Sequence, residues 1–130
     1  MNDSPRGLLL FAHGARDPAW ALPFEAVARR CAEQQPGCPV VLAFLEFMTP
    51  GLVEAGESLA ARGCRQVDVV PLFLGAGGHV RKDIPRLLAE LTERHPDVAW
   101  RLQPTIGEAA AVVEAMALAA LAPLSAGGPG

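Results

Sequence analysis

The sequence predicts an α/β fold, a three-layer α/β/α sandwich built on a four-stranded parallel sheet. Short continuous apolar runs, typical of strands buried on both faces, alternate along the chain with stretches whose apolar residues recur at helical spacing. A helix between two such strands joins them in parallel through a right-handed crossover. The order β-α-β-α-β-α-β-α therefore predicts the strand order 2-1-3-4, counted along the chain, as in a truncated doubly wound sheet.

Four apolar runs predict the strands. They lie at residues 8–12, 40–45 and 67–74, with a weaker run at 98–102. Pro71 lies inside the third run, where a proline removes one hydrogen-bond donor from the ladder. We therefore expect a bulge in the third strand.

Capping residues and prolines set the expected ends of the first two helices. Asp17 is the expected N-cap of the first, and its regular part is expected to begin near Leu22, because another proline follows there. The second helix is expected to start with Thr49 as its cap and Pro50 at its first position. Gly63 is expected to end it.

The last two helices are less clearly bounded. The third is expected to begin at Asp83, to accommodate Pro85 in its first turn, and to end before His95. An alanine-rich fourth helix is expected over residues 107–121.

Composition limits the class of protein. A chain of 130 residues, 51% hydrophobic and 19% charged, predicts one domain with a real core. We expect a single domain over residues 1–122 and a flexible tail, rich in Pro and Gly, over 123–130. The net charge of −3 lacks the cationic surplus that a nucleic-acid partner requires. No apolar stretch approaches the roughly 20 residues that span a bilayer, so no membrane partner is expected.

The cysteines bear on the compartment. Cys31, Cys38 and Cys64 are odd in number and lack C-x-x-C spacing, so we expect neither a disulfide framework nor a thiolate zinc site. The first residues do not resemble a secretory signal, because the apolar run is short and Asp3 precedes it. The expected compartment is the cytoplasm.

Three side chains with catalytic chemistry fall at one predicted edge of the sheet. Ligands of open parallel sheets bind beyond the carboxyl ends of the strands, where the winding reverses. In this order that point lies between the first and third strands. His13 follows the first strand, Glu46 ends the second, and His79 follows the third. Because neighbouring strands are about 4.8 Å apart, both imidazoles are expected to reach one point.

Each of these residues also has a structural interpretation. A histidine after a strand often only bonds a turn, and the pair at the switch point is what favours a functional one. Glu46 follows an apolar run, where an unpaired buried carboxylate is costly, so it lies at the cleft or pairs with an arginine. Asp17 and Asp83 are expected to be helix caps, and His95 to be a surface residue.

Cations and glycines flank the two histidines. Arg16 follows His13, while Arg81 and Lys82 follow His79, which predicts a cationic rim and an anionic ligand, although solvated charges would give the same pattern. Gly77 and Gly78 permit a tight loop with its backbone close to that ligand. Imidazole accepts protons near neutral pH and binds Co, Fe, Ni and Zn. With no third histidine and no cysteine at this edge, we expect an open coordination sphere rather than a closed zinc site.

Three segments resemble one family. They are the run from His13 to Pro18, Phe44-Leu-Glu46, and the run from Val70 to Pro85. Together they look like the single-domain sirohydrochlorin chelatases, and the resemblance covers about residues 7–121. It implies a flavodoxin-like chelatase fold and the insertion of a divalent metal (Co²⁺, Fe²⁺ or Ni²⁺) into sirohydrochlorin, without ATP, in cobalamin or sirohaem biosynthesis. The metal is then a substrate, and no organic cofactor is implied.

The resemblance also implies roles. His13 and His79 would bind the metal and accept protons, with Glu46 as a relay. The substrate's peripheral carboxylates would meet the cationic rim and the glycine loop described above. Ala15 stands where many relatives have serine, so any role of that hydroxyl is absent here. Because one cleft edge offers a single wall to a broad macrocycle, we expect a homodimer with its clefts facing each other.

Two other functions fit the same residues. A metal carrier would bind Co²⁺ or Ni²⁺ through the same histidines without turnover. A phosphoryl-transfer enzyme would use His13 as nucleophile, with Arg16 and the glycine loop holding phosphate. Histidine phosphatases place an arginine directly before the histidine, however, and Ala12 occupies that position here.

Overall fold

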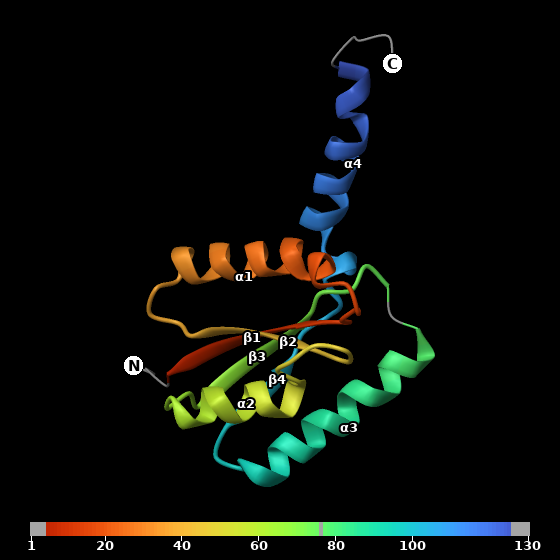
Figure 1. Ribbon diagram of the computed structural model, residues 1–130. Helices are drawn as coiled ribbons and strands as arrows, with labels where there is room; N and C mark the ends of the chain where they lie inside the picture. The colour runs from red at the N-terminus through yellow and green to blue at the C-terminus, as the bar shows by residue number, and fades with distance from the viewer. Residues whose placement is uncertain (1–4, 76, 126–130) are drawn as a thin grey trace.

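The sheet has four parallel strands in the order β2-β1-β3-β4, which confirms the predicted fold class. The computed structural model describes residues 5–75 and 77–125, without the side chain of His79. The elements, with two 3-10 turns η1 and η2, are β1 (Arg6–Ala12), η1 (Pro18–Ala21), α1 (Leu22–Gln34), β2 (Val40–Phe44), α2 (Leu52–Ala61), β3 (Gln66–Pro71), α3 (Gly78–Arg94), β4 (Ala99–Leu102), η2 (Ile106–Glu108) and α4 (Ala110–Ser125). Helix α1 covers one face of the sheet, and α2 and α3 cover the other (Figure 1).

The expected bulge at Pro71 is wrong. The register between β1 and β3 runs without interruption from Arg6 opposite Gln66 to Phe11 opposite Pro71. Pro71 is the last residue of β3, so its missing N–H costs the sheet little. The ladder resumes at once, because the Leu72 N–H donates to the Phe11 carbonyl over 2.8 Å.

The first helix begins as predicted. The Asp17 carboxylate accepts a hydrogen bond from the Ala19 N–H over 2.9 Å and caps η1, which begins with Pro18. Helix α1 follows from Leu22. The capping aspartate and the two prolines therefore give a short 3-10 turn and then the regular helix.

The second helix starts later than expected and ends as predicted. Its N-cap is Gly51, whose N–H donates to the Glu54 carboxylate over 3.0 Å, so Thr49 does not cap it. Pro50 lies in the preceding loop, where its carbonyl accepts from the Phe44 N–H. Gly63 follows the end of α2 with φ of +91°, the left-handed conformation that favours glycine at this position.

The third helix begins five residues earlier than expected. Gly77 is its N-cap, and the segment from Gly78 to Lys82, expected to be a loop, forms its first turns. Asp83 is therefore an interior residue and not a cap; the Arg86 guanidinium donates to it over 3.4 Å. Pro85 lies inside the helix, where it removes one backbone donor.

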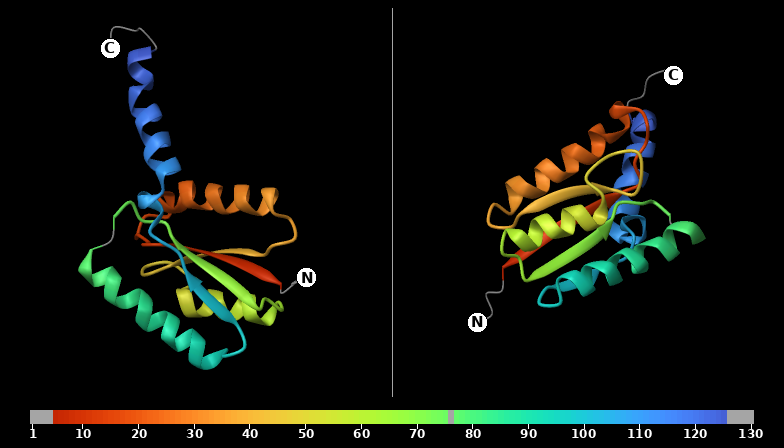
Figure 2. Two further views of the ribbon diagram at one scale, coloured as in Figure 1. Left: turned by 180° about the vertical axis from the view of Figure 1, so that it is seen from behind. Right: turned by 60° about the horizontal axis from the view of Figure 1, so that its bottom comes forward.

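The fourth helix differs from its expected range at both ends. Residues 106–108 form η2, and α4 begins at Ala110 and includes residues 123–125 of the expected tail. Residues 126–130 lie outside the described residues. Helix α4 rises away from the sheet on the side of α1 and does not pack along it (Figure 2). Within the described residues, no helix is both long and apolar enough to cross a membrane.

The two faces of the sheet are packed unequally. The α2/α3 face holds the main core, with Leu9, Phe11, Val67 and Val69 of the strands fully buried against Leu59 and Leu91 of the helices. The α1 face holds a small cluster around Ala12, Ala21 and Phe44. Beside that cluster, the part of this same face that α1 leaves uncovered contains an apolar pocket of about 580 Å³.

Candidate functional site

The loops that follow β1, β2 and β3, and the first turn of α3, gather at one edge of the sheet (Figure 1). This is the edge at which the sequence placed His13, Glu46 and His79. His13 directly follows β1, and Glu46 lies two residues beyond β2. The parallel strands thus bring together residues 33 positions apart.

The backbone sets the distance between the first two loops. Beyond the strands, the Leu45 N–H donates to the Ala12 carbonyl over 2.9 Å and the Glu46 N–H donates to the His13 carbonyl over 3.1 Å. Gly14 has φ of +95°, and a Cβ there would lie 1.9 Å from the Glu46 carbonyl oxygen. Only glycine allows this close approach.

The side chains of His13 and Glu46 meet on this frame. Nε2 of His13 is 2.9 Å from Oε2 of Glu46, and the two side chains are 44% and 49% exposed. A carboxylate only accepts hydrogen bonds, so Nε2 is the donor, and in the neutral imidazole Nδ1 then carries the lone pair. Among the described residues, Nδ1 has no hydrogen-bond partner. Histidines that bind metals commonly donate their other N–H to a carboxylate in this way.

Two phenylalanines complete the surroundings of the pair. The Phe73 ring lies edge-on to the His13 ring, with the centroids 6.3 Å apart, and is itself buried against Phe11. The Phe47 ring lies under the Arg16 guanidinium at 4.7 Å. Sequence analysis missed both. The position of Phe73 could have been inferred from the sequence, since it follows a central strand just before the glycine loop. The position of Phe47 could not, because its φ of +69° is not expected for a phenylalanine.

The backbone of His79 lies in the first turn of α3, while its side chain is outside the described residues. The structure therefore assigns His79 to this edge by its place in the fold. Among the side chains that the structure describes, no group of three or more His, Cys, Asp or Glu forms a metal site. The described part of the site offers one imidazole and one carboxylate.

The expected cationic rim is divided between two sides of the site. Arg16, in the loop after β1, stacks on the ring of Phe47, which lies in the loop after β2. Arg81 instead lines a pocket of about 240 Å³ where α3 meets the ends of β3 and β4, together with Glu108. Lys82 is exposed on α3. Since β1 lies between β2 and β3, the two arginines flank His13 and do not form one cluster.

The glycines before α3 and the histidine after it differ from what the sequence predicts. Gly77 and Gly78 form the N-terminal end of α3 and not a separate loop. His95 caps the far end of α3 near Glu57, with its side chain 28% exposed and its ring beside Trp100, so it is less of a surface residue than expected. His95 lies at the opposite end of the helix from His79.

The fold and this edge define a class: a single parallel α/β domain with a histidine–carboxylate pair at the topological switch point of its sheet. The CbiX family model matches residues 7–120 of the chain. The chain belongs to the CbiX family.

Relatives and solved structures agree with this assignment. The sirohydrochlorin cobaltochelatase of Saccharolobus solfataricus is 42% identical over 84 residues, which are 63% of this chain and 62% of that protein, so the chain matches about three-fifths of its relative's length. A cobalamin (vitamin B12) biosynthesis CbiX protein from Marinobacter aquaeolei has a TM-score of 0.81 and 32% identity, over 93% of this chain and 98% of that one. The cobalt complex of the sirohydrochlorin chelatase SirB from Bacillus subtilis subspecies spizizenii has a TM-score of 0.78 and 25% identity, over 88% of this chain and 49% of that one.

Proposed function

We propose that this protein is a sirohydrochlorin chelatase, an ATP-independent lyase that inserts a divalent metal (Co²⁺, Fe²⁺ or Ni²⁺) into the macrocycle in cobalamin or sirohaem biosynthesis. The observation that carries the proposal is the His13–Glu46 pair, in which Nε2 meets the carboxylate and Nδ1 has no hydrogen-bond partner among the described residues. Its support is the family and the relatives that bear this activity in their names, one of them solved with cobalt.

Metal insertion replaces two pyrrole N–H protons by one metal ion, so the site must deliver a cation and accept protons. In the proposal, Nδ1 of His13 holds the metal at the macrocycle face, and His79, whose backbone lies in the first turn of α3, supplies a second imidazole. An imidazole that releases the metal is free to take up a proton. Glu46 keeps the His13 ring oriented and stabilises it once the ring is protonated.

The flanking cations bind the macrocycle's peripheral carboxylates. Arg16 on one side of His13 and Arg81 on the other each bind a carboxylate of the broad ring in this proposal, with Lys82 and the amides of Gly77 and Gly78 as further donors. The substrate is thereby held flat over the histidine.

The remaining features of the proposal follow from size and composition. The macrocycle needs two walls, so the working form is a homodimer with its site edges together. No organic cofactor, nucleic acid or membrane takes part, since the metal and the tetrapyrrole are the substrates. All three cysteines are free thiols, in keeping with the cytoplasm as the compartment.

The test is a spectroscopic insertion assay with sirohydrochlorin and each metal in turn. We expect product with at least one metal, and a loss of about 100-fold or more in kcat for His13→Ala and for His79→Ala. His95→Ala is the matched control, since this third histidine lies at the far end of α3, and it should retain the rate.

Glu46→Gln separates orientation from proton uptake. The amide still accepts a hydrogen bond from Nε2 but cannot hold a protonated ring by charge. We expect an intermediate loss, with metal binding retained. Metal binding without product under every condition would identify the protein as a metal carrier. Unchanged rates in both histidine variants would remove the roles proposed for them.

A further inference from the structure

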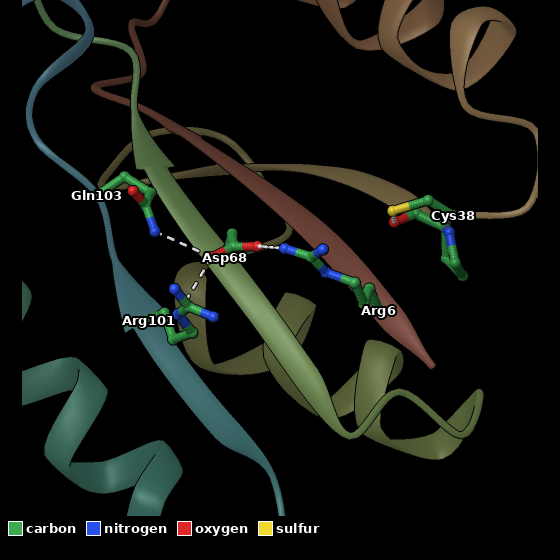
Figure 3. Close-up of polar contacts among 6 residues, drawn as sticks. Arg6, Cys38, Asp68, Arg101 and Gln103 are labelled. Atoms are coloured by element: carbon green, nitrogen blue, oxygen red, sulfur yellow. Dashed lines mark hydrogen bonds and ion pairs between the residues drawn. The ribbon is translucent and has the colours of Figure 1, made fainter. Parts of the chain in front are cut away.

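Arg16 differs from the ion-paired arginines of this chain in the kind of partner that it has. Arg6 and Arg101 reach Asp68 of β3 from the strands on either side, over 3.2 Å and 3.8 Å, and the carboxylate offsets their charge (Figure 3). Among the described residues, no carboxylate pairs with Arg16. Its guanidinium lies instead over the Phe47 ring, with Cζ 4.7 Å from the ring centroid. Arg16 is therefore held in place without being neutralised.

An aromatic ring holds a guanidinium in a different way from a carboxylate. The negative face of the ring attracts the cation, but the ring has no oxygen to accept the hydrogen bonds that the guanidinium donates. The N–H groups of Arg16 therefore stay available for another acceptor. A carboxylate can take two of them at once, because the planar guanidinium matches its geometry.

The backbone brings the two side chains together next to the His13–Glu46 pair. Arg16 follows Gly14 by two residues, and Gly14 is the point at which the loop after β1 touches the backbone of Glu46. Phe47 directly follows Glu46. The Glu46 N–H also donates to the His13 carbonyl over 3.1 Å, which joins the same two loops. The contact between the ring and the guanidinium thus belongs to the frame that holds the imidazole and the carboxylate.

Phe47 adopts a backbone conformation that a phenylalanine normally avoids. Its φ is +69°, in the left-handed region where the Cβ crowds the following carbonyl oxygen. Hydrogen bonds around it hold the loop in this shape, since the Phe44 N–H donates to the Pro50 carbonyl over 2.9 Å. Glycine or asparagine would adopt this conformation at a lower cost. Residues held against their preference in this way are concentrated at functional sites.

The core does not explain why this residue is a phenylalanine. Phe11, Phe44 and Phe73 are buried, whereas Phe47 is 55% exposed and belongs to neither hydrophobic cluster. Among the described residues, the Phe47 ring has one aromatic or cationic partner, which is Arg16. The role of the ring therefore lies in what it does to this arginine.

We propose that Phe47 is a positioning residue for substrate binding: its ring fixes the Arg16 guanidinium beside the His13–Glu46 pair, with N–H groups free to bind a peripheral carboxylate of the macrocycle. The substrate is that of the proposed function, on which this inference rests. Arg16 makes the contact, and Phe47 acts through it by restricting the rotamers of a long side chain. Less conformational freedom is then lost when the carboxylate binds.

The first measurement is the dissociation constant of metal-free sirohydrochlorin, from an absorbance titration, so that binding is read without insertion. Arg16→Ala should raise it by about 10-fold or more, because a charge-assisted contact is lost. Phe47→Leu keeps an apolar side chain but removes the ring face, and should raise it by about three- to fivefold. Phe47→Tyr restores the ring face and should stay within about twofold of the wild type.

A double variant separates positioning from direct contact with the substrate. If Phe47 acts through Arg16, the double variant Arg16→Ala/Phe47→Leu should bind the macrocycle as Arg16→Ala alone does. In the insertion assay, Phe47→Leu should raise KM and leave kcat unchanged. Independent losses that multiply in the double variant, or a loss confined to kcat, would overturn the positioning role.

Phe47→Gly separates positioning from a structural role. Glycine relieves the left-handed strain, so the midpoint of urea denaturation should stay the same or rise, while the dissociation constant rises as in Phe47→Leu. A fall in stability that parallels the loss of affinity would assign Phe47 to the structure of the loop. Phe24→Leu is the matched control, because the Phe24 ring lies 4.6 Å from the ring of Trp20 and should not affect binding.

The outcomes distinguish this inference from the proposed function. A wild type that binds no macrocycle would contradict the proposed function and, with it, the role of Phe47. A wild type that binds, together with a Phe47→Leu variant that binds equally well, would overturn the role of Phe47 alone. A macrocycle whose carboxylates are esterified should bind equally to both chains, because Arg16 then has no anionic partner. A difference that persists with the ester would show direct contact by the ring and contradict positioning.

Discussion

The two faces of the sheet differ in what covers them. On one face, α2 and α3 bury a continuous core in which six large side chains have almost no exposed surface. On the other face, α1 covers β2 and part of β1, and the rest is a wide apolar pocket with a polar cluster beside it. The same strands supply both faces, since alternate residues point to opposite sides. What differs is therefore the helix that each face receives.

The difference assigns separate tasks to the two faces. The α2/α3 face supplies the stability of a single copy, because its packing is complete within one chain. The α1 face is packed only in part, and its pocket leaves apolar side chains of β1, β3 and α1 open. Substitutions that compare the two faces therefore test this division.

The largest effect is expected for Leu59→Ala on the packed face. Leu59 is fully buried, and its truncation leaves a cavity among neighbours that cannot collapse, so the free energy of unfolding should fall by about 3 kcal/mol. Urea denaturation at low protein concentration measures it. Leu72→Ala, which lines the open pocket, should cost about 1 kcal/mol under the same conditions. Equal losses would remove the distinction between the faces.

A smaller effect is expected for Gly56→Ala, where the packed face has no room for a methyl group. The added Cβ would lie 2.7 Å from one methyl of Leu91 and 3.1 Å from Cζ3 of Trp100. Leu91 is fully buried and cannot move aside, so overpacking outweighs the better helix propensity of alanine, with a loss of about 2 kcal/mol. Gly37→Ala is the control, because nothing lies within 4 Å of a Cβ there, and its stability should be unchanged or slightly higher.

The polar part of the open face should contribute less. Asp68, 18% exposed, accepts hydrogen bonds from Arg6 and Gln103, and Asp68→Asn leaves the two neighbouring guanidinium groups without a counter-charge. We expect a loss of about 1 kcal/mol in urea denaturation. Asp97→Asn breaks the exposed ion pair with Arg65 and should change stability by less than about 0.5 kcal/mol. A larger loss for Asp97→Asn would contradict this ranking.

The smallest effect concerns the rim of the packed face, where α2 meets α3. The hydrogen bond from Arg94 lowers the pKa of Glu57 below its usual value, with a further contribution from His95. A carboxyl whose pKa is lower in the folded protein stabilises it above the unfolded pKa, and that contribution disappears as the pH falls through the folded pKa.

Glu57→Gln should therefore be less stable than the wild type at neutral pH, and the difference should disappear as the pH falls through the lowered pKa of Glu57. Urea midpoints measured across this range show it. Glu33→Gln, for which the described part of the chain shows no ion pair, should follow the wild type at every pH. A difference that persists in acid would assign the effect to packing.

The fold was largely predictable from the sequence because each apolar run is bounded by residues with one dominant preference. Asp17 and the prolines after it determine how α1 begins, and Gly63 determines how α2 ends. The start of α3 was missed because Gly77 and Gly78 favour a loop locally, whereas the burial of Val80 and Ile84 against the core extends the helix through them. The position of α4 was not predictable, since its uniform apolar pattern indicates burial, whereas the structure leaves nearly every residue of this helix exposed.

The site was predictable in outline. Strand order alone brings His13 and Glu46 to one edge, because the ends of neighbouring parallel strands meet there. The separation of Arg16 from Arg81 could not be predicted, because it depends on the stacking of Arg16 on Phe47 and on the early start of α3. Side-chain contacts of this kind are decided by tertiary packing and leave little trace in a local pattern.

The glycine at position 14 has a consequence for engineering the protein. Because two main-chain segments touch there, the separation of the backbone positions that carry the imidazole and the carboxylate is set by the peptide backbone. Position 46 can therefore be exchanged for aspartate, glutamine or histidine while the anchor points of both groups stay fixed. A series of such replacements would measure how the radius of the cation and the donor atom at position 46 determine which metal the site selects.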